Sequence, residues 1–96
     1  MKQQAKRELK EWARGFRLLG DPTRLGILRL LAGGPKKVKA LCKALGLQQP
    51  NVSHHLGLLR GGRLVDGTRK GKAVTYSIEK HAIKVLSSAC LKLTPK

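Results

Sequence analysis

The chain has 96 residues, which is enough for one small domain, residues 1–96, whose hydrophobic core is marginal. Its 21 lysines and arginines outnumber five aspartates and glutamates, so the net charge is +16. Such a charge points to polyanionic partners, with nucleic acid before an anionic membrane surface.

Both a membrane-spanning and a secreted protein are disfavoured. No apolar run approaches the ~20 residues that cross a bilayer, and no secretory leader opens the chain. Cys42 and Cys90 alone predict neither a disulfide framework nor a closely spaced pair of metal ligands. We therefore expect a cytoplasmic, nucleoid-associated protein with no membrane partner.

The first predicted helix covers residues 3–19, where apolar side chains recur on one stripe that includes Trp12 and Phe16. This stripe fits two roles equally well, because it can cover the core of its own subunit or pack across a dimer. Gly20 ends the helix.

The second predicted helix covers residues 22–31, with Asp21 as its N-cap and Pro22 as its first residue. Leucines and isoleucine fall on all its sides, so we expect it to be the most buried helix. Gly26 in its interior is unfavourable by about 1 kcal/mol relative to alanine, which indicates close approach of another backbone.

Residues 39–63 have the pattern of a helix-turn-helix. A short helix ending at Gly46 is followed by a second helix over residues 50–60, which starts at Pro50 and ends before Gly61 and Gly62. In the second helix one side is apolar, and the other carries hydrogen-bonding side chains with no acid among them. A helix held in this way can enter a DNA major groove and contact base edges. The polar set is Gln48, Gln49, Asn51, Ser53, His54 and Arg60.

After this motif the pattern changes from helix to strand. Residues 63–65 and 73–78 alternate or carry β-branched side chains, and a basic, glycine-containing loop over residues 66–72 joins them. This is a β-hairpin with a charged tip, a wing that suits the phosphate backbone or the minor groove. A last helix is expected over residues 79–93, with the residues after it frayed. A short strand near Lys37 completes the order α-α-α-α-β-β-α.

No acid lies between Pro22 and Val65, and lysines gather at the start of the third helix, the unfavourable end for positive charge. Such a concentration indicates either phosphate binding or a lysine surface kept for solubility. The candidate phosphate-binding residues are Lys37, Lys39, Arg60, Arg69, Lys70 and Lys72.

Several segments, in order, resemble the ArsR/SmtB winged-helix repressors. They are L-G-D-P-T-R-L-x-I-L-x-L-L (residues 19–31), A-L-x-x-A-L-G-L (40–47), V-S-H-H-L-x-L-L-R (52–60), G-R-L-V (62–65) and Y-S-I (76–78). The resemblance implies a mainly α winged helix-turn-helix fold and a homodimer built from the first and last helices. It also implies repression of transcription on double-stranded DNA, usually relieved by an inducer.

By position, the resemblance gives roles to individual residues. Gln48, Gln49, Asn51, Ser53 and His54 would face DNA, while His55 would support the helix or meet a phosphate. The wing would contribute Arg69, Lys70 and Lys72. The dimer interface would contain Leu9, Trp12, Phe16, Ile83, Leu86 and Cys90.

The chain departs from the metal-sensing members of this family. Lys37 and Lys39 stand where arsenic- and cadmium-type sensors have cysteines, which excludes a soft-metal site there. Glu79 and His81 match the first half of a zinc-type site, but its later ligands are missing, so fewer than four ligands remain. No metal or other cofactor is therefore expected, and the inducer is not identified.

The chain has two cysteines, one in the third predicted helix and one in the last. Cys42 and Cys90 lie on apolar helix faces, where we expect packed small side chains, with a thiol switch as the alternative.

Besides a sequence-specific repressor, the charge is compatible with a nonspecific nucleoid or RNA-binding winged-helix protein, and an antitoxin-like partner module is a third alternative. An enzyme is not expected, because neighbouring serine and histidine on one helix do not face each other and no paired carboxylates are present.

Overall fold

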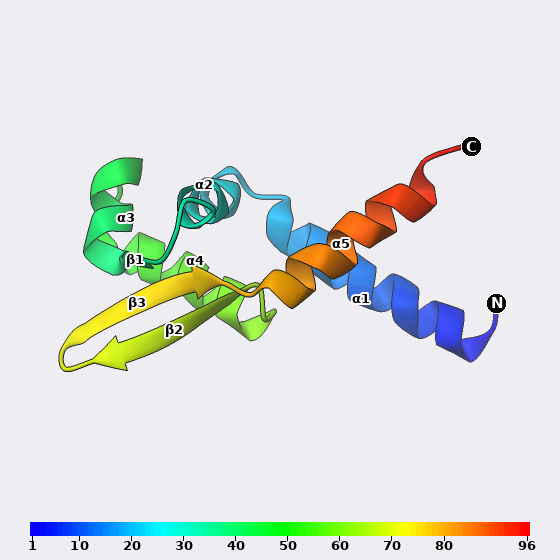
Figure 1. Cartoon of the computed structure of the whole chain (residues 1–96), viewed down its shortest axis with the longest axis horizontal. Helices are drawn as coiled ribbons and strands as arrows, with labels where there is room; N and C mark the ends of the chain where they lie inside the picture. The colour runs from blue at the N-terminus through cyan, green and yellow to red at the C-terminus, as the bar shows by residue number, and fades with distance from the viewer.

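The computed structural model describes all residues from 1 to 96. The molecule is elongated, and different elements lie at its two ends (Figure 1). The elements are α1 (Gln3–Leu19), α2 (Pro22–Leu31), β1 (Lys36–Lys37), α3 (Val38–Leu45), α4 (Gln49–Gly61), β2 (Val65–Lys70), β3 (Ala73–Ile78) and α5 (Lys80–Leu93). At one end lie α3, α4 and the β2–β3 hairpin, and at the other lie the outer parts of α1 and α5 with both termini. The predicted fold class is confirmed, including the short strand at Lys37.

The core joins α2, α3, α4 and the inner end of the hairpin to α5. Its ten residues are Ile27, Leu28, Leu31, Leu41, Val52, Leu56, Leu59, Leu64, Val65 and Leu86. The side chain of each is at most 7% exposed. In α2 and α4 the buried residues recur at helical spacing. They therefore fix which side of each helix faces the core.

As expected, α2 has the largest buried share of any helix, with Ile27, Leu28 and Leu31 buried among its ten residues, but it is not buried on all sides. Leu25 is 49% exposed, because the core covers only the side of α2 that carries Ile27 and Leu28. The reason given for Gly26 also needs correction: a Cβ there would lie 3.1 Å from Cδ2 of Leu45, so a side chain of α3 approaches rather than a backbone.

Glycine and proline set the turn of the helix-turn-helix as predicted. Gly46 ends α3 in the left-handed conformation, with φ +68°, and its N–H donates to the carbonyl oxygen of Cys42. Pro50 occupies the first turn of α4, where the absence of an N–H is harmless. The turn therefore brings α4 back against α3.

The hairpin differs from the prediction, because most of the expected loop is strand. Antiparallel pairing continues to Lys70 opposite Ala73, so only Gly71 and Lys72 form the turn. Gly71 has φ +61° and precedes a residue with negative φ, as in a type II′ turn. The expected strand at residues 63–65 is also corrected, since Arg63 adopts φ +60° and β2 begins at Val65.

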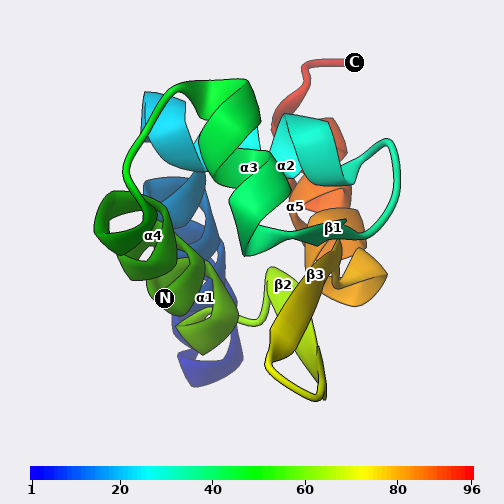
Figure 2. The same cartoon turned by 90° about the vertical axis from the view of Figure 1, so that its left-hand side faces the viewer.

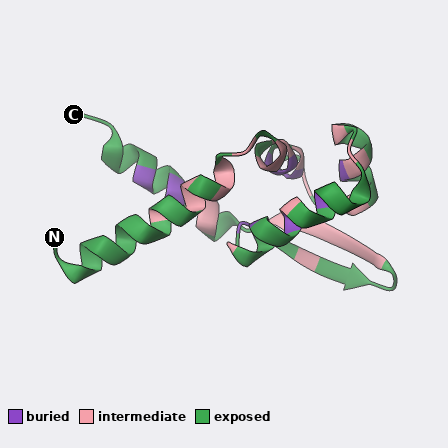
Figure 3. Ribbon diagram, turned by 180° about the vertical axis from the view of Figure 1, so that it is seen from behind, coloured by how far each residue is buried: buried purple, intermediate pink, exposed green.

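The terminal helices pack against each other but leave much apolar surface uncovered. No residue of α1 is buried (Figure 3). A Cβ added at Gly15 would lie 2.7 Å from Cδ2 of Leu86, so α1 and α5 approach closely at that glycine. Farther out, Nζ of Lys92 lies 5.5 Å from the centre of the Trp12 ring, a cation–π contact.

The two cysteines differ in exposure. Cys42 is half-buried against the core, as expected, whereas Cys90 is exposed on α5 within a single subunit. No helix has both the length and the apolar character needed to cross a membrane.

We predict that Gly15→Ala lowers the free energy of unfolding by about 1 kcal/mol, although alanine favours helix. The extra methyl group must displace the buried side chain of Leu86, and overpacking of this kind costs roughly 1–3 kcal/mol. Gly57→Ala is the matched control, since no atom lies within 4 Å of the position that the Cβ of an alanine would take there. We expect this control to raise stability by up to ~1 kcal/mol in urea denaturation. A Gly15→Ala protein as stable as the Gly57→Ala protein would contradict this account of the packing.

Candidate nucleic-acid interface

The recognition helix α4 has one buried side and one solvent side. Val52, Leu56 and Leu59 are 0% exposed and fix which side faces the core. All the predicted base-contacting residues, Gln48, Gln49, Asn51, Ser53 and His54, are exposed. Contact with base edges requires this exposure, because a side chain must reach past the helix surface into the groove.

A single arginine of α2 joins α4 to the end of α1. The Nε atom of Arg24 donates to the carbonyl oxygen of Leu18 at 2.7 Å. Its Nη1 atom lies 3.3 Å from Nδ1 of His55 in α4. Sequence reasoning missed this role of Arg24, although the residue stands in the D-P-T-R segment already singled out.

Asp21 completes this junction. Its Oδ2 atom accepts a hydrogen bond from the backbone N–H of Arg24 at 3.1 Å and lies 3.9 Å from Nδ1 of His55. The hydrogen bond from the backbone N–H of Arg24 lowers the pKa of the Asp21 carboxyl, and the positive charge of Arg24 and the electrostatic effect of His55 add to this against the opposing effect of desolvation. His55, with its side chain 16% exposed, therefore supports the helix from within.

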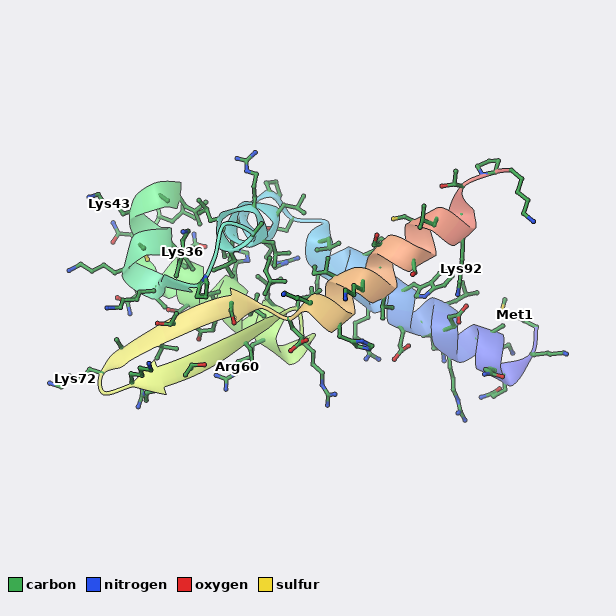
Figure 4. The ribbon with its side chains drawn as sticks, viewed as in Figure 1. Met1, Lys36, Lys43, Arg60, Lys72 and Lys92 are labelled. Carbon is green, nitrogen blue, oxygen red and sulfur yellow. The ribbon has the colours of Figure 1, made fainter.

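Most of the predicted phosphate-binding residues lie at one end of the molecule. Lys37 and Lys39 are exposed where α3 begins and border a shallow depression together with Lys36 and Lys43. Figure 4 shows Lys36, Lys43 and the hairpin residue Lys72 at this end. Figure 2, which looks onto the same end, shows α3, α4 and the hairpin facing the viewer.

The hairpin and the end of α4 supply the remaining cations. Arg69 and Lys70 are exposed on β2, and Lys72 is exposed in the turn. Arg60 is exposed too, but it lies apart from this group, near the middle of the molecule (Figure 4). There it borders a pocket that also contains Asp66 and Glu79, so it is the one predicted cation with carboxylates nearby.

An exposed polar helix packed across a short turn from another helix, followed by a cationic hairpin, defines a winged helix-turn-helix protein of the DNA-binding class. Comparisons with known proteins narrow the class. The family model for bacterial regulatory proteins of the arsR family matches residues 21–66. A homodimeric winged helix-turn-helix DNA-binding domain from Mycobacterium bovis, solved by NMR, has a TM-score of 0.79 and 28% identity. That match covers 97% of this chain and 87% of that chain.

Curated relatives agree with this assignment. The arsenical resistance operon repressor of Escherichia coli is 42% identical over 79 residues, which are 77% of this chain and 68% of that protein. The transcriptional regulator NmtR of Mycobacterium tuberculosis is 42% identical over 72 residues, which are 74% of this chain but only 60% of NmtR. The chain belongs to the arsR family of bacterial regulatory proteins, as its sequence motifs indicated. This is a family of transcriptional regulators rather than of enzymes.

Potential metal ligands are scattered within the single subunit. No three histidine, cysteine, aspartate or glutamate side chains lie close enough together to hold one. Glu79, half of the possible zinc pair, instead accepts a hydrogen bond from the backbone N–H of His81 at 3.3 Å and caps α5. A metal site in this chain therefore lacks a preformed ligand set.

We predict that Asp21→Asn lowers the melting temperature at pH 7 and does so by less at pH 3. Asparagine can still cap α2, but it lacks the charge that Arg24 and His55 favour. Because the pKa of Asp21 is lowered by folding, its stabilising contribution is present at neutral pH. That contribution is lost as the pH falls below about 4.

Melting curves of both proteins between pH 7 and pH 3 test this expectation. Glu8→Gln is the control, since Glu8 is exposed on α1 and makes no ion pair. A difference between the native and Asp21→Asn proteins that persists unchanged at pH 3 would rule out the electrostatic explanation.

Proposed function

We propose that the protein is a homodimeric transcriptional repressor that binds a palindromic operator in double-stranded DNA. In this proposal α4 enters the major groove, and the β2–β3 hairpin lies on the phosphate backbone or in the minor groove. The observation that carries it is the solvent side of α4, whose polar side chains are all exposed and include no acid. Because the five helices and the hairpin pack on one core, the proposal treats residues 1–96 as one domain.

Base contacts and phosphate contacts fall on different residues in this proposal. Gln48, Gln49, Asn51, Ser53 and His54 contact base edges, where amide and imidazole groups form directional hydrogen bonds. The cations bind phosphates and position the helix without carrying sequence information. This second group is Lys37, Lys39, Arg60, Arg69, Lys70 and Lys72.

The terminal helices support the homodimer. Leu9 on α1 is 44% exposed, and Leu91 and Leu93 on α5 are 73% and 66% exposed. A second copy would cover such a surface, and the solved relative from Mycobacterium bovis is described as homodimeric. Of the predicted interface residues, Trp12, Phe16 and Ile83 are half-buried and Cys90 is exposed, so a partner can reach them. Leu86 is only 6% exposed and supports the interface from inside its own subunit.

The proposed place of action is the bacterial cytoplasm, on nucleoid DNA. One relative is named for arsenical resistance. In this chain, Lys37 and Lys39 stand at the start of α3, where the resemblance places the cysteine ligands of arsenic-type sensors. The single subunit also holds no cluster of three potential metal ligands. We therefore expect repression without a resident metal ion. A nonspecific nucleoid or RNA-binding protein is the competing function, favoured by the net charge of +16.

Selection of bound duplexes from a random pool at about 150 mM salt tests the function, because screening then reduces nonspecific attraction. We expect a palindrome with half-sites about 34 Å apart. On that site, Asn51→Ala or His54→Ala is expected to relax base preference by roughly 1–3 kcal/mol per lost contact.

Lys70→Gln is the control for these substitutions. It should weaken binding to all duplexes alike and flatten the salt dependence by about one unit of log–log slope. If the native protein enriches no palindrome and binds random duplex equally well, the nonspecific function is correct instead.

We predict that Leu9→Glu converts the dimer to monomer and lowers operator affinity by roughly a hundredfold, since two half-sites then bind independently. A buried charge at the interface is costly, whereas in a monomer this position is already 44% exposed. Leu25→Glu is the matched control, because Leu25 is 49% exposed but lies on α2. Sedimentation equilibrium measures the outcome, and an unchanged mass for Leu9→Glu would place the interface elsewhere.

A further inference from the structure

The first helix carries a stripe of positive charge that the proposed function does not use. Its cations recur every three or four residues, so at 3.6 residues per turn they share less than half of the helix circumference. All are exposed. This α1 stripe consists of Lys2, Lys6, Arg7, Lys10, Arg14 and Arg17.

The charge of the α1 stripe is not neutralised within the protein. Of the acids of the helix, Glu8 lies outside the stripe and Glu11 stands beside Arg7 and Arg14, but no lysine or arginine of the molecule forms an ion pair with a carboxylate. Like charges four residues apart repel each other along a helix, as Lys6 and Lys10 do. The first turn also holds no acid to balance the positive end of the helix dipole. A bound polyanion would relieve both effects.

The packing of α1 sets the direction of this stripe. Gly15 and Trp12 face α5, through Leu86 and the Lys92 side chain. The middle of the stripe lies on the opposite side of the helix, about half a turn away, while Arg14 at its edge borders a pocket shared with α5. In Figure 1 α5 lies in front of α1, so the stripe is turned to the rear. Figure 3 shows that rear face, with α1 and α4 both toward the viewer and both largely exposed.

We infer that the α1 stripe binds backbone phosphates of double-stranded DNA, extending the DNA interface from α4 onto the first helix. In a dimer joined through α1 and α5, the α1 helices lie between the two recognition helices. The phosphates contacted are therefore those at the centre of the operator. Charge complementarity and continuity with the exposed side of α4 identify DNA as the occupant. This inference rests on the proposed function, because it requires an operator held by α4.

Two matched double variants test the inference on the intact chain. Lys6→Gln with Lys10→Gln removes two charges four residues apart from the α1 stripe. Lys80→Gln with Lys84→Gln removes the same charge at the same spacing from α5, where Lys84 lies on the side turned away from Leu86 and α1. Circular dichroism and sedimentation confirm that each variant is folded and dimeric.

Operator affinity is then measured between 50 and 300 mM salt. Each phosphate contact adds about 0.9 to the log–log slope, so the Lys6/Lys10 variant should lose up to about two units per protomer. Its preference for the operator over mismatched sites should be unchanged. The Lys80/Lys84 variant should keep the native slope. Ethylation of phosphates at the operator centre should inhibit binding of the native protein and not of the Lys6/Lys10 variant.

The outcomes separate this inference from the proposed function. A native protein with no preferred site overturns the proposed function itself. A native protein that prefers an operator, with equal slopes for the two double variants, overturns only the inference, because the effect is then that of net charge. A central ethylation pattern shared by the native protein and the Lys6/Lys10 variant overturns it as well.

Discussion

The rotational setting of α4 is the constraint on which the other features depend. Three side chains, Val52, Leu56 and Leu59, are fully buried at helical spacing and leave the helix one orientation about its axis. A rotation by one residue, about 100°, would expose a leucine and turn a polar side chain into the core. The apolar residues of α4 thus determine which of its side chains face solvent, and in the proposed complex these are the side chains presented to DNA.

The position of α4 along the molecule depends on a polar junction rather than on the core alone. Arg24 donates to a carbonyl group at the end of α1 and meets His55 in α4, while Asp21 both caps α2 and faces His55. The proposed dimer surface on α1 and the DNA-contacting surface on α4 are therefore joined through a single arginine. Since the two recognition helices must match the helical repeat of DNA, such a junction relates dimer geometry to half-site spacing.

Local chemistry explains what the sequence could predict. The bounds of α1 and the start of α2 were predicted correctly, because Gly20, Asp21 and Pro22 end one helix and start the next through short-range contacts. The wing was misjudged because residues 66–70 have loop composition, yet they pair with β3, a contact that local sequence does not encode. The exposure of Leu25 was missed for the same reason, since burial depends on which side of a helix its neighbours cover.

Net charge and specificity have separate origins in this molecule. A charge of +16 attracts any duplex. This electrostatic attraction weakens as the salt concentration rises, for specific and nonspecific sites alike. Discrimination between sites requires directional hydrogen bonds from side chains held in fixed positions, which the exposed side of α4 provides. The exposed cations on α3 and the hairpin lie at the same end of the molecule as that helix but not on its central turns, so in the proposed complex they increase affinity and leave sequence preference to Asn51, Ser53 and His54. A strongly basic chain of this design can therefore be selective, because the residues that supply attraction are not the residues that distinguish bases.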